Sequence, residues 1–420
     1  MFTARGYYIS TIAILSVALG AFFYLPAISM VSLPAVIFIL MARVAFPLHT
    51  EVDVTRLVER KVILQGDTLS IKLKIQNNGE RLAVVKVTDE LPSNMELVDG
   101  SNVILLGLKN NETKSFNFSL SASLPGRYML SKISIEVMDP LQIFHKRKII
   151  QTYEEIRAYP FVETSRHSIL MLSLRNEPGE NRSRRQGEGE EFYSVRNYVP
   201  GDRLRRINWK ASARYSALFT NQYTSELAGE LMIVLDSRFA LLAEDDEKVQ
   251  FRFCSSAAAT IAYSSLMSRN KVGLMIMGDL LEKVPPAYGF KQLRKILAAL
   301  SDFRAGRRWQ ISKVNSYLRL LFPKVNEVTI ITPLADVEIL DSVSALHEDG
   351  FNTLVVAPDI WSERIGRLKD RERRIATKLF IQNRKVFLNQ VRKYATVVDW
   401  DIAIPISHSM RNVEGKVGFG

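Results

Sequence analysis

The sequence of 420 residues predicts a multidomain chain: a transmembrane helical hairpin, then a β-sandwich, then a doubly wound α/β domain. Three observations support this prediction. Two long apolar runs open the chain, alternating β-branched segments follow, and buried strand-like runs then alternate with helix-like runs. The expected boundaries are 1–48 for the hairpin, 49–160 for the sandwich, 161–186 for a polar linker, 187–228 for a charged, aromatic segment and 229–420 for the α/β domain.

The hairpin is expected from two neighbouring apolar runs. Residues 7–25 carry no charge, and a second run extends from Pro26 to Phe46. Each has about the ~20 residues that cross a bilayer as a helix. A cleaved signal peptide would have one such run rather than two. We therefore expect two membrane-spanning helices, the second kinked at Pro34.

The flanking charges predict the orientation of this hairpin. Its short connection has no basic residue, so the positive-inside rule places both chain ends and the later domains in the cytoplasm of a cell-membrane protein. The basic residues at the outer ends are Arg5, Arg43, Arg56, Arg60 and Lys61.

Residues 51–159 show the period-two pattern of half-buried strands, with turn signals at Asn78-Gly79 and Pro125-Gly126. Six to eight short strands at this spacing predict an immunoglobulin-like sandwich. The pattern includes no catalytic constellation, so we interpret the domain as a spacer or protein-binding module. Residues 164–187 are polar and are expected to form a mobile linker.

The α/β prediction rests on five apolar strand candidates, 230–237, 272–279, 327–334, 352–359 and 395–401. Buried runs interleaved with helices are typical of a doubly wound parallel sheet. The helix candidates between and after them are 246–269, 291–300, 314–321, 337–347 and 361–393.

Composition narrows the partners and the chemistry. A net charge of +12 and a pI near 9.6 favour an acidic partner, such as anionic lipid, nucleic acid or an acidic protein face. The single cysteine, Cys254, excludes an internal disulfide and a cysteine-based zinc site. It lies in an apolar run, so we expect a buried thiol and not a nucleophile.

The segment 187–226 organises the rest of the chain. A turn at Pro200-Gly201-Asp202 leads into a run expected to be helical from Arg203 to Tyr215, with Asp202 as its cap. So many charges and aromatics must either pair internally or meet a partner. The expected partner-binding residues are Arg196, Tyr198, Asp202, Arg205, Arg206, Trp209, Lys210 and Arg214.

An ordered series in this segment resembles the signature of domain-of-unknown-function family fifty-eight. The series is Tyr193-x-x-Arg196-x-Tyr198-x-Pro200-Gly201-Asp202-x-x-Arg205-x-Ile207-x-Trp209-Lys210, followed by Ala213-Arg214. The resemblance implies a membrane hairpin, a β-rich segment and a von Willebrand factor A-like end. It also implies association with a MoxR-type AAA+ ATPase, hence a scaffold or adaptor role in assembling or maturing protein complexes.

Von Willebrand factor A-like domains hold a divalent ion through Asp-x-Ser-x-Ser after the first strand, and this chain departs from that pattern. Arg238 and Ala240 replace the two serines, and an arginine in the cluster would repel a cation. We expect Asp236 to pair with Arg238 or to cap the following loop, and no metal to bind. The degenerate site would comprise Asp236, Ser237, Thr332 and Asp336.

Other chemistry is not indicated. Phosphate-loop, nucleophile-elbow and zinc-protease motifs are missing, so we expect neither catalytic residues nor a cofactor. A membrane-linked enzyme of cell-envelope metabolism is the alternative function, and a nucleic-acid-binding protein is the second. Six acids lie in the same region as the bases and would repel phosphate, so nucleic acid is an unfavoured partner.

For the charged and aromatic residues of the segment 187–226, we favour a role in internal structure first and a role in docking a partner protein second. The expected division places Trp209 and one of Arg205 and Arg206 against the terminal domain, with the other arginine facing a partner. The helix 361–394 holds eleven Lys/Arg and three Asp/Glu, a net +8 of the total +12. Its apolar residues are expected to face the sheet, and its bases an anionic lipid or acidic protein.

Overall fold

The computed structural model describes residues 2–47, 49–163, 186–224, 230–238, 244–302, 306, 309–334, 337–360 and 371–410. The chain divides into two compact units, one formed by residues 1–161 with 300–302 and the other by 162–299 with 303–420. The expected linker lies outside the described residues from 164 to 185.

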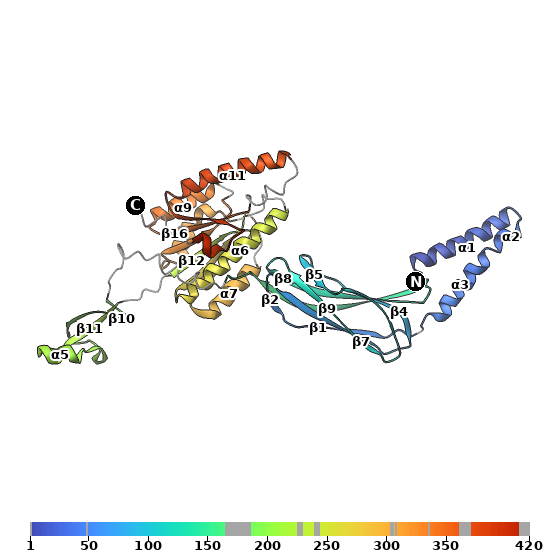
Figure 1. Ribbon diagram of the computed structural model, residues 1–420, viewed down its shortest axis with the longest axis horizontal. Helices are drawn as coiled ribbons and strands as arrows, with labels where there is room; N and C mark the ends of the chain where they lie inside the picture. Colours follow the sequence, from blue (N-terminus) through green and yellow to red (C-terminus); the bar gives the residue numbers. More distant parts are fainter. Residues whose placement is uncertain are drawn as a thin grey trace. The chain divides into compact units, whose positions relative to one another are not determined.

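The first unit begins with an apolar helical hairpin (Figure 1), built from α1 (Ala4–Phe22), α2 (Pro26–Ser29) and α3 (Ser32–Ala45). Both α1 and the stretch Pro26–Ala45 are long and apolar enough to span a membrane. Gly20 lets α1 and α2 approach each other closely, because a Cβ there would lie 2.0 Å from the Ser29 hydroxyl oxygen.

The expected kink at Pro34 is wrong in its position. The helix is interrupted earlier, between Ser29 and Ser32, and Pro34 lies in the first turn of α3. Proline is tolerated there because the first-turn N–H groups have no intrahelical acceptor.

Two antiparallel-rich sheets follow the hairpin and share one hydrophobic core. One sheet has the order β1-β3-β7-β5 and the other β2-β9-β8-β4-β6. Buried and exposed residues alternate along β3 and β8, so each sheet turns one apolar face inward. The strands are β1 (Val52–Val58), β2 (Val62–Leu64), β3 (Thr68–Asn77), β4 (Leu82–Asp89), β5 (Met95–Asp99), β6 (Val103–Leu108), β7 (Thr113–Ala122), β8 (Gly126–Met138) and β9 (His145–Tyr159).

The β-rich prediction is confirmed, with nine strands among the described residues of this body where six to eight were expected. The long β9 lies within the expected period-two range 51–159, although its basic start and its charged middle weaken the alternation. The immunoglobulin-like assignment of this body stays a prediction.

A buried ion pair joins the two sheets. Arg56 of β1 donates through Nε to Asp89 of β4 at 2.9 Å, and a second guanidinium nitrogen also binds that carboxylate. Arg56 also donates to the Leu130 carbonyl oxygen at 2.9 Å and to the Thr152 hydroxyl at 2.8 Å. Burial raises the pKa of Asp89, and the hydrogen bonds from Arg56 act against that shift.

The second unit contains a six-stranded sheet with the order β14-β13-β12-β15-β16-β17, parallel except for β14. All five expected strands are confirmed. β14 was not expected because it contains Pro285 and Pro286, which are tolerated here on an edge strand. The strands are β12 (Glu230–Asp236), β13 (Lys271–Met277), β14 (Leu281–Ala287), β15 (Glu327–Ile331), β16 (Asn352–Asp359) and β17 (Thr396–Asp401).

Helices lie against this sheet, and α8, α9 and α11 share a buried core with alternate residues of its strands. Gln292 of α7 donates to the Val272 carbonyl oxygen of β13 at 2.7 Å. The helices are α6 (Glu244–Met267), α7 (Gly289–Asp302), α8 (Val314–Leu321), α9 (Glu338–Glu348) and α11 (Arg371–Val391), with a 3₁₀ turn, η2 (Ile311–Lys313), before α8.

The same unit includes a separate two-stranded sheet, here called the arm, spanning residues 186–224 (Figure 1). The segment between its strands holds a 3₁₀ turn and a short helix. Its elements are β10 (Gln186–Asn197), η1 (Leu204–Arg206), α5 (Trp209–Tyr215) and β11 (Phe219–Thr224).

Candidate functional site

The strand order of the α/β sheet marks one edge as a candidate site. Numbered within the sheet, the strands run 3-2-1-4-5-6, so the order reverses between β12 and β15. Ligands of open α/β sheets bind beyond the carboxyl ends of the strands at such a reversal. Asp236 ends β12 there and Thr332 follows β15. The structure thus brings together two of the four residues expected to form the degenerate metal site.

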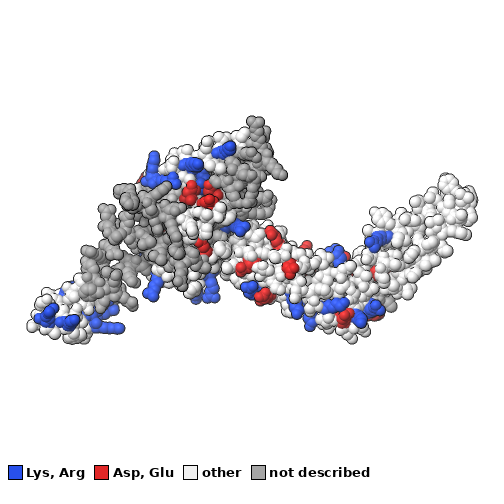
Figure 2. Space-filling view, in the orientation of Figure 1, with Lys and Arg blue, Asp and Glu red and all other residues white. Residues whose placement is uncertain are grey.

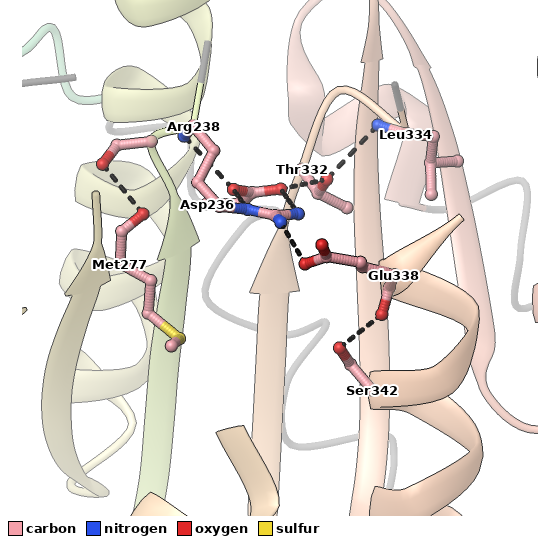
Figure 3. Close-up of polar contacts among 8 residues, drawn as sticks. Asp236, Arg238, Met277, Thr332, Leu334, Glu338 and Ser342 are labelled. Carbon is pink, nitrogen blue, oxygen red and sulfur yellow. Dashed lines mark hydrogen bonds and ion pairs between the residues drawn. The ribbon is translucent and has the colours of Figure 1, made fainter. Parts of the chain in front are cut away.

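Arg238 fills this position (Figure 3). Its Nε lies 2.9 Å from one Asp236 carboxylate oxygen and its Nη2 lies 3.3 Å from the other. The Thr332 hydroxyl donates to Asp236 at 2.9 Å, and Arg238 reaches Glu338 at the start of α9 at 2.6 Å. The Arg238 side chain is 7% exposed, so a buried guanidinium already supplies the positive charge at this corner.

The donor set at this corner does not fit a divalent cation. The Ser237 hydroxyl donates to the Met277 carbonyl oxygen at 3.0 Å, and Asp236 is occupied by Arg238 and Thr332. A Mg²⁺ ion requires six oxygen ligands in octahedral geometry. Here the cationic side chain of Arg238 lies among the oxygen atoms that would have to supply them. Asp336 lies outside the described residues.

Groups of three or more His, Cys, Asp or Glu side chains that could hold a metal are absent from the described residues. Cys254 of α6 is fully buried, and burial raises the pKa of its thiol. The expectation that this cysteine is a buried thiol is therefore confirmed.

The arm is held together by its own hydrogen bonds. Asn208 caps α5 by accepting from the Ala211 N–H at 2.9 Å, and its side-chain amide donates to Asn221 at 2.8 Å. The Ser212 hydroxyl accepts from the Phe219 N–H at 2.9 Å. These bonds attach the helix to β11, so the arm presents a defined surface.

Arg196 and Asp202 stabilise the turn that leads into η1. Arg196 binds Asp202 at 2.6 Å, and Asp202 also accepts from the Val199 N–H at 3.0 Å and the Thr220 hydroxyl at 3.2 Å. The Arg196 hydrogen bond lowers the pKa of Asp202. Asp202 therefore fastens a turn, and the expectation that it caps a helix is wrong because Asn208 has that role.

The expected single helix from Arg203 to Tyr215 is also interrupted. After η1 the backbone is extended at Ile207, and α5 begins only at Trp209. Ile207 is buried and bridges Thr220 of β11, whereas Leu204 is 70% exposed. Because of this break between η1 and α5, Leu204 and Ile207 do not share one buried helix face.

The outer face of the arm is apolar and basic. Trp209 is 66% exposed and Tyr215 67%, which contradicts the expectation that Trp209 packs against the terminal domain; Ile207 and Ser212 are buried instead. Arg205, Lys210 and Arg214 are exposed, with no hydrogen bond or ion pair to another described residue. Figure 2 shows basic side chains on the part of the arm that includes α5.

Sequence reasoning missed some of this surface. Val199, Leu204, Tyr215 and Leu218 are exposed in the same segment as Trp209 and the bases. The sequence did hold a signal for them. The segment contains many large apolar residues, but they do not recur with the regular period that predicts a buried face. Tyr198 is half-buried, and its N–H donates to the Leu218 carbonyl oxygen at 2.8 Å, closing the loop.

The basic helix near the end of the chain differs from expectation. Residues 361–370 lie outside the described residues, and Ile375, Leu379 and Val386 of α11 are exposed, although they were expected to face the sheet. Arg384 is buried instead, bound to Asp399 at 2.7 Å and to the Ala357 carbonyl oxygen at 2.9 Å. This pairing sets the rotation of the helix.

One family model matches a region that includes both the arm and the α/β sheet. Residues 194–364, which include most of the arm and much of the α/β sheet, match the model of "Protein of unknown function DUF58". The chain contains a DUF58 domain. The expected family is thereby confirmed for this region of the chain.

One curated relative is the uncharacterized protein YeaD of Bacillus subtilis, 25% identical over 265 residues. The match covers 61% of this chain and 63% of YeaD, so it spans less than two thirds of that relative's length.

Solved structures resemble parts of the chain only slightly. A CARDB domain from Pyrococcus furiosus, crystallised with di-metal ions, has 12% identity and a TM-score of 0.20, covering 26% of this chain and 93% of that one. The zinc 2-glycoprotein complex with prolactin inducible protein, from human seminal plasma, has 14% identity and a TM-score of 0.20, with 26% and 97% covered. Likenesses this slight assign neither fold nor function to the DUF58 domain.

Proposed function

We propose that this protein is a membrane-anchored cytoplasmic scaffold whose arm docks a partner protein. The hairpin holds the chain in the bilayer, the β unit acts as an immunoglobulin-like spacer, and the DUF58 domain carries the arm on a von Willebrand factor A-like sheet. The family resemblance suggests a MoxR-type AAA+ ATPase as the partner, and assembly or maturation of protein complexes as the task.

The observation that carries this proposal is the division of labour within the arm. One set of residues, including Arg196, Asp202 and Asn208, is used up in internal hydrogen bonds. A second set, including Trp209 and Arg205, is exposed. Tryptophan and arginine are the residues that most often dominate the energetics of protein interfaces. A surface with both, held on a fixed frame, loses little entropy on binding.

The filled corner of the sheet supports the same interpretation. Arg238 neutralises Asp236 without a metal ion, so the fold around that corner is maintained by the chain itself. Binding through the arm would then need no divalent cation. The basic outer face of α11 could add a second contact to an acidic protein or an anionic lipid surface.

The test uses the purified full-length protein in detergent and a purified MoxR-type ATPase from the same organism. We expect measurable binding, and we expect Trp209→Ala and Arg205→Glu each to weaken it by at least tenfold, a loss of about 1.4 kcal/mol or more. The matched control is Lys313→Glu in η2, which makes the same charge change outside the arm.

Equal affinity of all these proteins would remove the arm as the docking site. No binding by the unaltered protein, with either nucleotide state of the ATPase, would remove this partner. Binding of the nucleotide-free ATPase should be unchanged by excess chelator, because the corner at Arg238 needs no metal.

A further inference from the structure

The base of the hairpin is joined to the β unit at one loop. Phe144, just before β9, stacks on Phe2 with ring centroids 4.9 Å apart and lies 6.3 Å from the ring of Phe46. Phe2 precedes α1 and Phe46 follows α3, so a single aromatic side chain contacts both ends of the hairpin. The Thr3 N–H donates to the Ile143 carbonyl oxygen at 2.8 Å, which fixes the junction through the backbone as well.

This loop is rigid because a buried carboxylate organises it. Asp139 accepts from the Leu141 N–H at 2.8 Å, the Ile143 N–H at 2.8 Å and the Phe144 N–H at 2.6 Å. Gly6 permits the close approach of α1, since a Cβ there would lie 2.5 Å from the Ile143 carbonyl oxygen. The β unit is therefore held at the end of the hairpin where both helices leave the apolar region.

The fold brings a distant basic run to this junction. Residues 145–148 read His-Lys-Arg-Lys and begin β9 directly after Phe144. A strand rises about 3.3 Å per residue, so Lys146 and Lys148 lie roughly 7 and 13 Å along the chain from Phe144. Lys148 reaches the Val52 carbonyl oxygen at 3.3 Å, at the start of β1, which places it beside the chain leaving α3.

Two further bases lie on the hairpin itself. Arg5 is in the first turn of α1 and Arg43 in the last turn of α3, and both are exposed. The basal cluster is defined here as Arg5, Arg43, Lys146, Arg147 and Lys148. Figure 2 shows the hairpin largely without charge and basic side chains near its base.

The neighbouring acids neutralise only part of the cluster. Arg147 lies 3.6 Å from Glu136, and Lys148 lies 3.9 Å from Asp53. Arg5, Arg43 and Lys146 have no hydrogen bond or ion pair to another described residue. Five bases against two acids leave a charge of +3 at the point where an apolar hairpin ends.

We propose that the basal cluster binds the phosphate groups of anionic phospholipids. This rests on the proposed anchoring of the hairpin in a bilayer. The polar layer of a bilayer extends roughly 5–8 Å beyond each side of the hydrocarbon core, and the bases of the cluster begin within that distance of Phe144. Arg5 and Arg43 lie in the end turns of the hairpin helices, and Lys146, Arg147 and Lys148 follow Phe144 in β9, so the bases flank the aromatic cluster of Phe2, Phe46 and Phe144 where the apolar hairpin ends. The apolar hairpin next to the basal cluster favours lipid as the ligand, because nucleic acid or an acidic protein would not require an apolar surface beside the bases.

The experiment compares bound lipids in the full-length protein, reconstituted in nanodiscs of mixed phosphatidylglycerol and phosphatidylcholine and measured by native mass spectrometry. We expect phosphatidylglycerol to be enriched on the protein. Basic residues at a membrane surface contribute about 1 kcal/mol each, or roughly fivefold. Lys146→Gln/Lys148→Gln should therefore lower the enrichment by roughly tenfold or more.

The matched control is Arg60→Gln/Lys61→Gln, which also removes two bases. The Lys61 carbonyl oxygen accepts from the Arg157 N–H, at the other end of β9 and some 36 Å from Lys146 at about 3.3 Å per residue. This control should keep the enrichment. Loss in both variants, or in neither, would overturn the proposal.

Two further measurements distinguish failure of the lipid-binding proposal from failure of the proposed membrane anchoring. Excess inorganic phosphate should not displace the lipid; displacement would make the cluster a site for free phosphate. Extraction of the protein from vesicles by alkaline carbonate would show that the hairpin does not anchor it, and the proposed membrane function would then fail. A protein that resists extraction but shows no lipid preference would refute the basal cluster alone.

Discussion

Arg238 binds both carboxylate oxygens of Asp236, and this pair stands where the order of the sheet reverses. The guanidinium also reaches Glu338, so two acids from different elements share one buried cation. The pair holds β12 and α9 together at the edge where open α/β sheets place their ligands.

Arg238→Met should destabilise the α/β unit by about 3–5 kcal/mol, because Asp236 would be left buried without its cation. Glu338→Gln is the matched control. The Glu338 side chain is 42% exposed, so its loss should cost about 1 kcal/mol or less. Hydrogen exchange of the β12 and β15 amides measures both changes, and wild-type protection in Arg238→Met would contradict the structural role of the pair.

The second prediction concerns metal ions. Because Arg238 stands among the oxygen atoms of this corner, titration of the full-length protein with Mg²⁺ or Mn²⁺ should give no saturable heat. Micromolar binding that disappears in Asp236→Ala would show that the arginine moves aside for a cation.

The regular elements were predictable because burial imposes a local period. The parallel strands appear as unbroken apolar runs and the β unit as alternation, as in β12 and β3. Asp236 and Arg238 are two residues apart, so their pairing could also be expected from the sequence.

Contacts between distant residues were not predictable in this way. Ile207 is buried where β11 returns beside it, whereas Trp209, two residues later, is exposed. Arg384 turns α11 by pairing with Asp399, a residue on a different element. The contact of Phe144 with Phe2 likewise joins residues 142 positions apart, for which a local pattern has no signal.

The buried pair of the β unit gives a third prediction. Arg56→Met should cost about 3–5 kcal/mol, and Arg56→Met/Asp89→Leu should recover much of it by removing the stranded carboxyl group. Burial already raises the pKa of Asp89, and the loss of Arg56 removes the hydrogen bonds that oppose this shift.

The pH dependence of that variant has a definite sign. An acid whose folded-state pKa is raised is most stabilising while protonated, at pH values below its ordinary pKa of about 3.9. The stability of Arg56→Met should therefore fall as pH rises from about 4, and the double variant should lack this slope. Chemical unfolding monitored through β-unit amides would reveal it, and parallel pH profiles would contradict the assignment.

The arm gives a fourth prediction, which separates its frame from its surface. Asn208→Ala removes the cap of α5 and the bond to Asn221, so local stability should fall by about 0.5–2 kcal/mol. Arg205→Glu should leave that stability unchanged, since Arg205 is exposed and unpaired among the described residues. Hydrogen exchange at Ala211 and Phe219 compares the two, and equal losses would mean that Arg205 belongs to the frame.

The last prediction concerns orientation, which the structure makes testable with single cysteines. Cys254 is buried, and burial raises the pKa of its thiol, so the unaltered chain should not react with an impermeant maleimide. Tyr24, at the tip of the hairpin, is 91% exposed, and Glu96 of β5 is exposed on the β unit. If the bases lie on the cytoplasmic side, Tyr24→Cys should react in intact cells and Glu96→Cys only after permeabilisation.

The reverse pattern of labelling would place the β unit outside the cell. In the folded protein Lys146, Arg147 and Lys148 join Arg5 and Arg43 at the base of the hairpin, whereas Arg56 is buried. Replacing Lys146 and Lys148 by Gln should leave the labelling pattern unchanged, because the positive-inside rule acts on bases near the spans during insertion, and these two lie about 100 residues later. A flipped pattern in that variant would mean that orientation is decided after the β unit has folded against the hairpin.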